Sequence, residues 1–241
     1  MTERILKTTD GKLRIQMPTQ LNEITLGQMM DLQARPDITD IEAISILSGI
    51  PVNELQNIKN YDDLHQFGEA VLSLSYQIKY LYNSNEIPKE IIFTMLGANE
   101  ISPQKTKVKV KVMQNLSIEP AGAFMAARDI ITEEINTHIK THGENDWQEH
   151  FNPSLNACCQ VLAQYFYCRA TGKKYSEYEV ESFIDEVKKL RVTEALPISK
   201  HFFTCYPNLS IPKTNFWHRL LPRLKKGRAS NRSKNLSIST L

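Results

Sequence analysis

The side chains in this sequence best suited to chemistry are histidines and cysteines spaced four residues apart. His201 and Cys205 would share one face of a helix, where an imidazole is able to activate a thiol nucleophile. No motif that orients a third group surrounds them, so we do not expect a catalytic pair.

His138 and His142 have the spacing that two metal ligands use on one helix face. No Glu follows His138, unlike in the H-E-x-x-H zinc helix, and a polar loop is expected near His142. We therefore interpret these two histidines as a surface pair and not as a zinc site.

The other cysteines indicate free thiols. Cys158 and Cys159 are adjacent in an apolar stretch, as core-filling cysteines are, and no C-x-x-C pair occurs. Cys158 and Cys168 would lie roughly 15 Å apart along a helix, because each residue contributes a rise of about 1.5 Å. They cannot bind one metal together. Free buried thiols are typical of a reducing compartment.

Three motifs of enzyme sites are missing from the sequence: the phosphate loop G-x-x-x-x-G-K, the dinucleotide fingerprint G-x-G-x-x-G and the nucleophile motif G-x-S-x-G. Neighbouring acids such as Glu133 and Glu134 are expected on a solvated helix face. The sequence thus predicts a non-enzymatic protein with no catalytic residues, no metal and no cofactor.

Length and composition are those of an ordinary globular protein. The 241 residues suffice for one large or two small domains, and 41% of them are hydrophobic and 23% charged. No run of about 18 apolar residues occurs, so no membrane-spanning helix is expected. The N-terminal residues lack the apolar stretch of a signal peptide. We expect a cytoplasmic protein.

Charge is distributed unevenly along the chain. Up to Glu194 the sequence carries 20 basic and 27 acidic residues, and after it nine basic residues and no acidic one. Such a split is typical of a basic tail that meets an acidic partner, nucleic acid included. A solubilising tail, a membrane-surface contact and a segment that folds against a partner protein are the alternatives. The tail residues expected to bind a polyanion, through stacking rings and positive charge, are Phe216, Trp217, Arg219, Arg223, Lys225, Lys226, Arg228, Arg232 and Lys234.

Residues 21–58 are expected to form three short helices with marked ends. Capping boxes open the first two, formed by Thr25 with Gln28 and by Thr39 with Glu42. Gly49 is placed to end the second helix, and Pro51 suits the first turn of the third. A longer helix is then expected from about residue 63 to residue 82. Its buried stripe recurs at spacings of three and four: Leu64, Phe67, Val71, Leu74, Ile78 and Leu81.

Three short stretches are expected to be β-strands, near residues 12–17, 90–96 and 107–113. The last one, KVKVKVM, alternates lysine and valine, which predicts a strand with one buried and one exposed face. Lysines on the exposed face also guard a sheet edge against unwanted pairing. We expect the three strands to pair with one another in one small antiparallel sheet.

The second half of the sequence is almost wholly helical in pattern. Its most apolar helix is LNACCQVLAQYFYCRA, which should be central and should end at Gly172. Ser176 and Glu179 match a third capping box. The residues expected to cap the helices of this half are Ser117, Ser154, Ser176, Thr193 and Thr214.

The fold class is therefore predicted to be mainly α, a helical bundle with a small antiparallel β element. We expect an N-terminal helical cluster with the small sheet in residues 1–113 and a C-terminal helical domain in residues 114–206. Residues 207–241 are expected to be a basic, flexible tail.

The N-terminal motifs resemble the opening of tail assembly chaperone-type proteins of tailed bacteriophages. The family pattern has a strand and a Pro, then Thr, an apolar residue and Gly-Gln at a helix start, then an Ile-Leu-Ser/Thr-Gly-Ile-Pro turn and a Glu-Leu helix. A second likeness, to helical halves of phage proteins, rests on the apolar helix and the Gly-x-x-Tyr turn at Gly172 and Tyr175. The residues that match the first pattern are Pro18, Thr25, Leu26, Gly27, Gln28, Ile46, Leu47, Ser48, Gly49, Ile50, Pro51, Glu54 and Leu55.

The resemblance implies a non-enzymatic role in virion morphogenesis. Such a chaperone binds the tape-measure protein and tail-tube subunits until the tube polymerises, which calls for apolar grooves between helices and for self-assembly. A homo-oligomer in the host cytoplasm is therefore expected. Met29, Met30 and Leu32 are candidate partner-binding residues, because methionine adapts to varied partners. Core packing is the alternative role for all three.

Two other functions remain open at this point. A structural subunit of the phage portal, neck or tail ring would stay in the virion, and the basic tail suits that role because it could contact DNA or a neighbouring subunit. A basic-tailed nucleic-acid-binding protein is the third alternative, and its retention on DNA would weaken steeply with salt.

Overall fold

The computed structural model describes residues 1–35, 37–59, 61–78, 86–96, 105–143, 147 and 151–205. The predicted mainly α fold class is confirmed, because helices dominate and the only sheets in these ranges are two small antiparallel pairs of strands. Within the same ranges, no helix has the length and apolar character needed to cross a membrane. The basic residues from Lys213 onward lie outside the described part of the chain.

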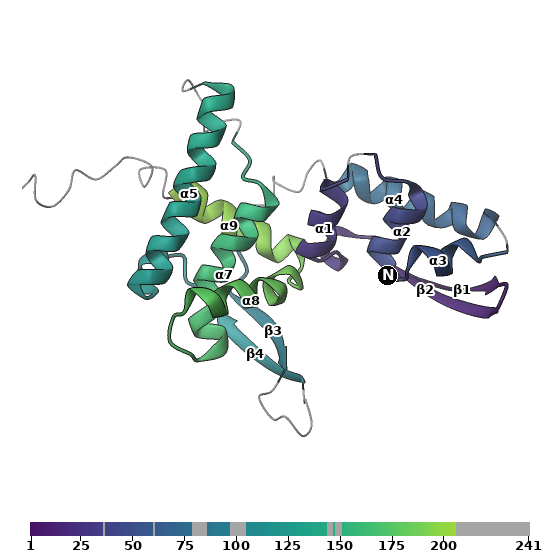
Figure 1. Cartoon of the computed structure of the whole chain (residues 1–241), viewed down its shortest axis with the longest axis horizontal. Helices are drawn as coiled ribbons and strands as arrows, with labels where there is room; N and C mark the ends of the chain where they lie inside the picture. Colours follow the sequence, from purple (N-terminus) through teal and green to yellow (C-terminus); the bar gives the residue numbers. More distant parts are fainter. Residues whose placement is uncertain are drawn as a thin grey trace, which may run out of the picture.

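The elements fall into two groups joined at α1 (Figure 1). The strands are β1 (Thr2–Thr8), β2 (Gly11–Met17), β3 (Glu90–Leu96) and β4 (Lys105–Lys111). The helices are η1 (Leu21–Glu23), α1 (Leu26–Gln33), α2 (Asp40–Ser48), α3 (Val52–Gln56), α4 (Tyr61–Ile78), η3 (Leu116–Ile118), α5 (Ala121–His142), α7 (Leu155–Thr171), α8 (Glu177–Lys188) and α9 (Val192–Cys205). One group contains β1, β2 and α2 to α4, and the other contains β3, β4 and α5 to α9.

The strands form two separate hairpins instead of the single sheet expected. The predicted strand near residues 12–17 pairs with β1, a strand that was not predicted from the sequence. The expected pairing of residues 12–17 with the two later strands is wrong. Thr8 is opposite Gly11, so only two residues join these strands, and such a turn closes a local hairpin at little entropic cost. Asp10 followed by Gly11 was the signal for this turn.

The β3–β4 hairpin was predicted correctly as a pair, although β4 spans 105–111 and not 107–113. Val110 is buried. The lysines that alternate with the valines, Lys107, Lys109 and Lys111, are exposed, as expected for a half-buried strand. The hairpin packs on the C-terminal helices. The ring of Phe93 lies 5.3 Å from that of Phe166 on α7 and 5.3 Å from that of Phe183 on α8.

Capping side chains mark where the helices α1 and α2 begin, as predicted. Both capping boxes form: Thr25 accepts from the Gln28 N–H, and the Gln28 Oε1 accepts from the Thr25 N–H at 3.0 Å. The other end of the same amide donates from Nε2 to the carbonyls of Ile46 (3.2 Å) and Leu47 (3.0 Å). Gln28 therefore satisfies groups at the start of α1 and at the end of α2 simultaneously.

The C-terminal helices follow the expected pattern with three corrections. Ser117 does not cap α5; it lies in η3, and α5 begins after Pro120. Thr193 lies inside α9, which begins one residue earlier. Ser176 does precede α8, but its side chain makes no capping bond, and Glu179 instead contacts the hydroxyl of Tyr167. The expected caps Ser154 and Gly172 are confirmed, and the expected cap Thr214 lies outside the described residues.

A short antiparallel contact joins the two groups of elements. The Leu26 N–H donates to the Leu190 carbonyl at 2.8 Å, and the Val192 N–H donates to the Ile24 carbonyl at 2.9 Å. Gly27 lies directly against the end of α8: a Cβ added there would be 3.1 Å from the Lys188 Cβ and 3.2 Å from its carbonyl oxygen. Glycine at this position therefore permits the close approach of α1 to α8.

Gly27→Ala should destabilise the protein although alanine is the better helix former. The new methyl group meets main-chain atoms that cannot move without disturbing the contact, so we expect the free energy of unfolding to fall by about 1–2 kcal/mol. Chemical denaturation of the full chain measures it.

Gly68→Ala in α4 is the matched control. Its Cβ would meet only the Asp40 carboxylate, at an ordinary 3.6 Å, so the helix preference of alanine should raise stability by about 1 kcal/mol. Equal effects of the two substitutions would show that the contact between α1 and α8 is not tight.

A second set of contacts fixes β4 and the start of α5 to α7. The Arg169 guanidinium on α7 lies 2.8 Å from the buried Glu119 carboxylate, donates to the Lys111 carbonyl at 2.7 Å and stacks 4.1 Å above the ring of Tyr165. The Tyr165 hydroxyl accepts from the Met113 N–H at 2.7 Å. Burial raises the pKa of Glu119, and the charge of Arg169 opposes that rise.

Arg169→Leu should lower the free energy of unfolding at neutral pH by about 2–4 kcal/mol, because it leaves the Glu119 carboxylate buried and unpaired. With its folded pKa raised above the unfolded value, Glu119 costs stability as pH rises through that range. The loss should therefore be smaller at pH 4 than at pH 7.

Arg128→Leu removes a charge paired with the exposed Asp129 and serves as the control. We expect it to change stability by less than about 1 kcal/mol at either pH. A loss for Arg169→Leu that does not depend on pH would contradict the role given to Glu119.

Candidate functional site: a groove between α5, α7 and α8

His201 and Cys205 lie together at the end of α9. The Cys205 sulfur is 3.4 Å from the His201 Nδ1, and the His201 Nε2 is 3.3 Å from the Gln114 carbonyl oxygen. The group within hydrogen-bonding distance of the His201 Nε2 is thus a backbone carbonyl and not a carboxylate. The Cys205 thiol is exposed.

His138 and His142 also meet, with ring centroids 4.3 Å apart in a stacked arrangement. The His138 ring also contacts the edge of Phe151, at 5.2 Å between ring centroids. Over the described ranges, no three His, Cys, Asp or Glu side chains converge in a way that could hold a metal ion. His138 therefore packs against the rings of His142 and Phe151.

The central cysteines are core residues. Burial raises the pKa of the Cys158 thiol to about 12 and that of the Cys159 thiol to about 11. Both thiols are therefore protonated near neutral pH, which makes them poor nucleophiles. This placement agrees with the expected core-filling role.

The candidate partner-binding residues on α1 differ in exposure. Met29 is fully buried in the hydrophobic core, so no partner can contact it in this conformation. Met30 and Leu32 are partly buried and pack against that core. Packing is therefore the role that the structure shows for Met29. The tail residues expected to bind a polyanion, Phe216 to Lys234, lie outside the described part of the chain.

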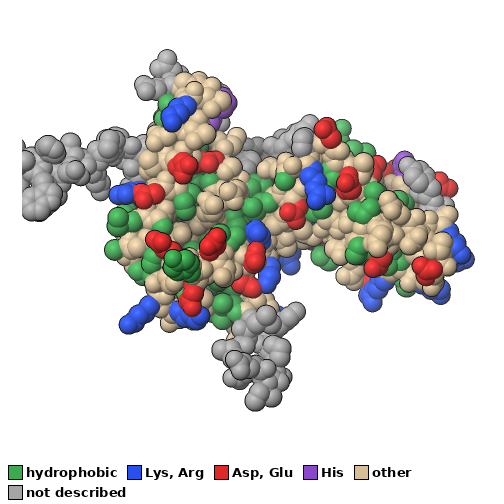
Figure 2. Space-filling view, in the orientation of Figure 1, with side chains coloured by type: hydrophobic (Ala, Val, Ile, Leu, Met, Phe, Trp, Pro, Cys, Tyr) green, Lys and Arg blue, Asp and Glu red, His purple; other side chains and the backbone are tan. Residues whose placement is uncertain are grey.

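The face of the C-terminal helices shown in Figure 2 mixes hydrophobic and acidic side chains. Two carboxylates on α8, Glu177 and Glu181, are exposed and lie four residues apart on one side of the helix. Between α8 and α5 the surface is hollowed, and this hollow is the candidate binding site.

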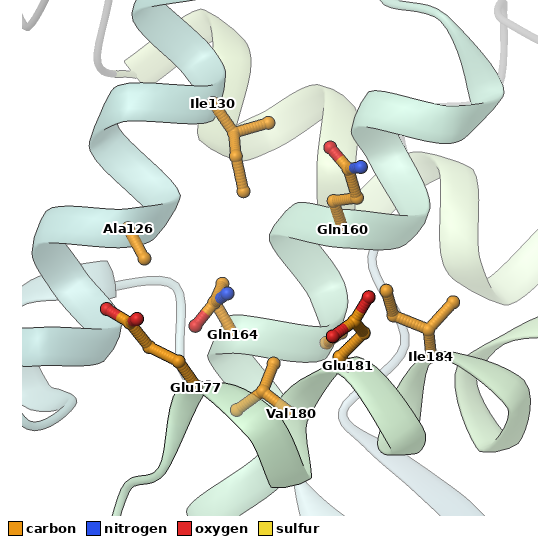
Figure 3. A pocket seen from close by; sticks show the side chains of 9 residues that line it. Ala126, Ile130, Gln160, Gln164, Glu177, Val180, Glu181 and Ile184 are labelled. Carbon is orange, nitrogen blue, oxygen red and sulfur yellow. The ribbon is translucent and has the colours of Figure 1, made fainter.

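The groove has a cavity volume of about 390 Å³ and is lined by three helices (Figure 3). In Figure 3, Ile130 points from α5 into the space between the helices, and Glu177 extends from α8 toward α5. The lining residues are Ala126 and Ile130 from α5, Gln160, Ala163 and Gln164 from α7, and Glu177, Val180, Glu181 and Ile184 from α8.

Small side chains on the facing helices leave this space open. α7 is buried on most of its faces and forms the floor, where the buried Ala163 fills little volume. Ala126 on α5 is equally small, so the two helices that flank α7 do not close over it. Val180 and Ile184 on α8 supply branched apolar groups on the opposite wall.

Tyr175 lies beside the groove and contacts both α5 and α7. The ring rests so close to Gly122 of α5 that a Cβ there would lie 2.6 Å from it, and its hydroxyl donates to the Gln164 Oε1 at 2.9 Å. Burial raises the pKa of Tyr175, and the negative charge of Glu177 raises it further. Glycine at position 122 is therefore what admits the tyrosine ring.

Among the residues that line the groove, two are carboxylates and none is basic. Apolar side chains on α5 and α8, two glutamines on α7 and an acidic rim fit an amphipathic segment whose apolar stripe is flanked by polar residues and by Lys or Arg. This site was not predictable from the sequence alone, because its residues come from three helices and only the Gly-x-x-Tyr turn at Gly172 and Tyr175 falls near it.

No protein-family model matches this chain, and neither a curated protein nor a solved structure matches it.

Proposed function

We propose that this chain is a non-enzymatic virion-morphogenesis protein of a tailed bacteriophage that binds a helical segment of another phage protein in the groove between α5, α7 and α8. The observation that supports the proposal is an open groove that combines apolar side chains of α5 and α8 with two glutamines of α7 and an acidic rim. The resemblance of the N-terminal motifs to tail assembly chaperones names the partner class: tape-measure or tail-tube proteins, bound in the host cytoplasm during assembly.

The dimensions of the groove suit a few anchoring side chains. A volume of about 390 Å³ accommodates apolar groups spaced at i, i+3 or i+4, and i+7 on a partner helix. Ile130 and Ile184 would contact those groups from the two walls. Glu177 and Glu181 would raise the association rate of a basic partner and make it depend on salt.

Ala126→Trp tests this site because an indole at that position fills the groove without altering charge. We expect it to weaken binding of recombinant tape-measure and tail-tube segments of the same phage by at least about tenfold, the equivalent of about 1.4 kcal/mol. Isothermal titration calorimetry with the full chain measures the change.

Asn136→Trp adds the same side chain at an exposed position on another face of α5 and is the control. It should leave the affinity unchanged. Equal affinities of the Ala126→Trp and Asn136→Trp variants for a segment that binds would place the binding site elsewhere.

The alternative is a structural subunit of the portal, neck or tail ring that remains in the virion. The nine basic residues after Glu194 favour it, since they suit contact with packaged DNA or with a neighbouring subunit. Quantitative mass spectrometry of purified particles distinguishes the two roles. A chaperone should be missing from the particles, whereas a ring subunit should be present in a fixed number of copies.

A further inference from the structure

We propose that the groove between α5, α7 and α8 is a docking site for residues 214–226 of the same chain. A partner segment would then have to displace this part of the tail. The inference goes beyond the proposed function, because it concerns a contact within one chain and requires no phage partner.

The composition of this segment complements the groove. Before Pro222 it contains four apolar residues in six positions, which at helical spacing fall on one side: Phe216, Trp217, Leu220 and Leu221. Pro222 interrupts the helical pattern, so we assign these residues, and not those after it, to the apolar walls. Residues 214–226 contain no acidic side chain that would be repelled by the rim.

The two surfaces also carry opposite charges. Glu177 and Glu181 are exposed and lie four residues apart on α8, which separates them by about 6 Å along the helix axis. Arg219 precedes Pro222, and Arg223, Lys225 and Lys226 follow it. Pairing Arg219 and Arg223 with the two glutamates orients the segment along α8. Such pairs at a surface are screened by salt.

The chain is long enough to reach the site. The described residues end at Cys205 on α9, which packs on α7 through Phe202 and Tyr165 at 4.6 Å between ring centroids. The groove lies on another face of α7, so the chain must pass about two helix diameters, or roughly 20–24 Å. The eight residues 206–213 span up to roughly 26–29 Å when extended.

The fluorescence of Trp217 tests the proposal in the full chain. Trp147, which packs against Phe151, is first replaced in a Trp147→Phe background, so that Trp217 is the sole indole. Docking predicts blue-shifted emission and weak quenching by acrylamide. Reversing the groove charges with Glu177→Lys and Glu181→Lys should release the segment, giving red-shifted emission and several-fold stronger quenching.

The decisive experiment is a charge swap that restores the docked state of Trp217. Adding Arg219→Glu and Arg223→Glu to the groove variant should return the blue-shifted, protected state. The control, Asp31→Lys with Glu54→Lys, makes the same change in net charge at exposed positions of the N-terminal helices and should have no effect. High salt should release Trp217 from the unaltered chain, and circular dichroism checks that every variant is folded.

Several results would overturn the proposal. One such result is that Trp217 is exposed in the unaltered chain at low salt. Another is that the charge swap does not restore blue-shifted emission and weak quenching. Protection that disappears on dilution together with a dimer would assign the groove to the tail of a second copy. Protection that arises only when duplex DNA is added would assign the tail to nucleic acid. None of these measurements involves a partner protein, so their failure is separate from failure of the proposed function.

Discussion

Two main-chain hydrogen bonds, between Leu26 and Leu190 and between Val192 and Ile24, connect the halves of this protein. They work because the segment before α1 is extended and because Gly27 lets α1 approach the end of α8. α1 then contacts α7, α8 and α9, and one continuous hydrophobic core includes residues of both groups. The N-terminal cluster is therefore held by these two hydrogen bonds together with the packing of α1 on the C-terminal helices.

The C-terminal helices are organised by α7. Its side chains are buried on most faces, and its one charged residue, Arg169, holds β4 and the start of α5 through its guanidinium. On another side of α7, Ala163 of α7 and Ala126 of α5 leave volume unfilled beside Val180 and Ile184 of α8. The acidic groove lies there. One side of α7 is thus attached to β4 and the start of α5, and another side borders the open groove.

The groove and the C-terminal tail of this chain carry opposite charges. The chain is acidic up to Glu194 and wholly basic in charge after it, and the groove rim carries Glu177 and Glu181 without a basic neighbour among its lining residues. An acidic groove and a basic tail in one chain offer a means to keep an apolar site covered until a partner arrives. A partner helix and the tail would then compete for the same apolar walls.

The sequence alone determined the helix boundaries that depend on neighbours three or four residues away. The Thr25, Thr39 and Ser154 caps and the ends at Gly49 and Gly172 were predictable because both bonding groups lie in one short stretch. Tertiary structure decided the packing of β3–β4 on α7 and α8, and the role of Glu179, which binds Tyr167 instead of capping α8. The groove belongs to this second class, because its shape arises only when three helices from distant parts of the chain pack together.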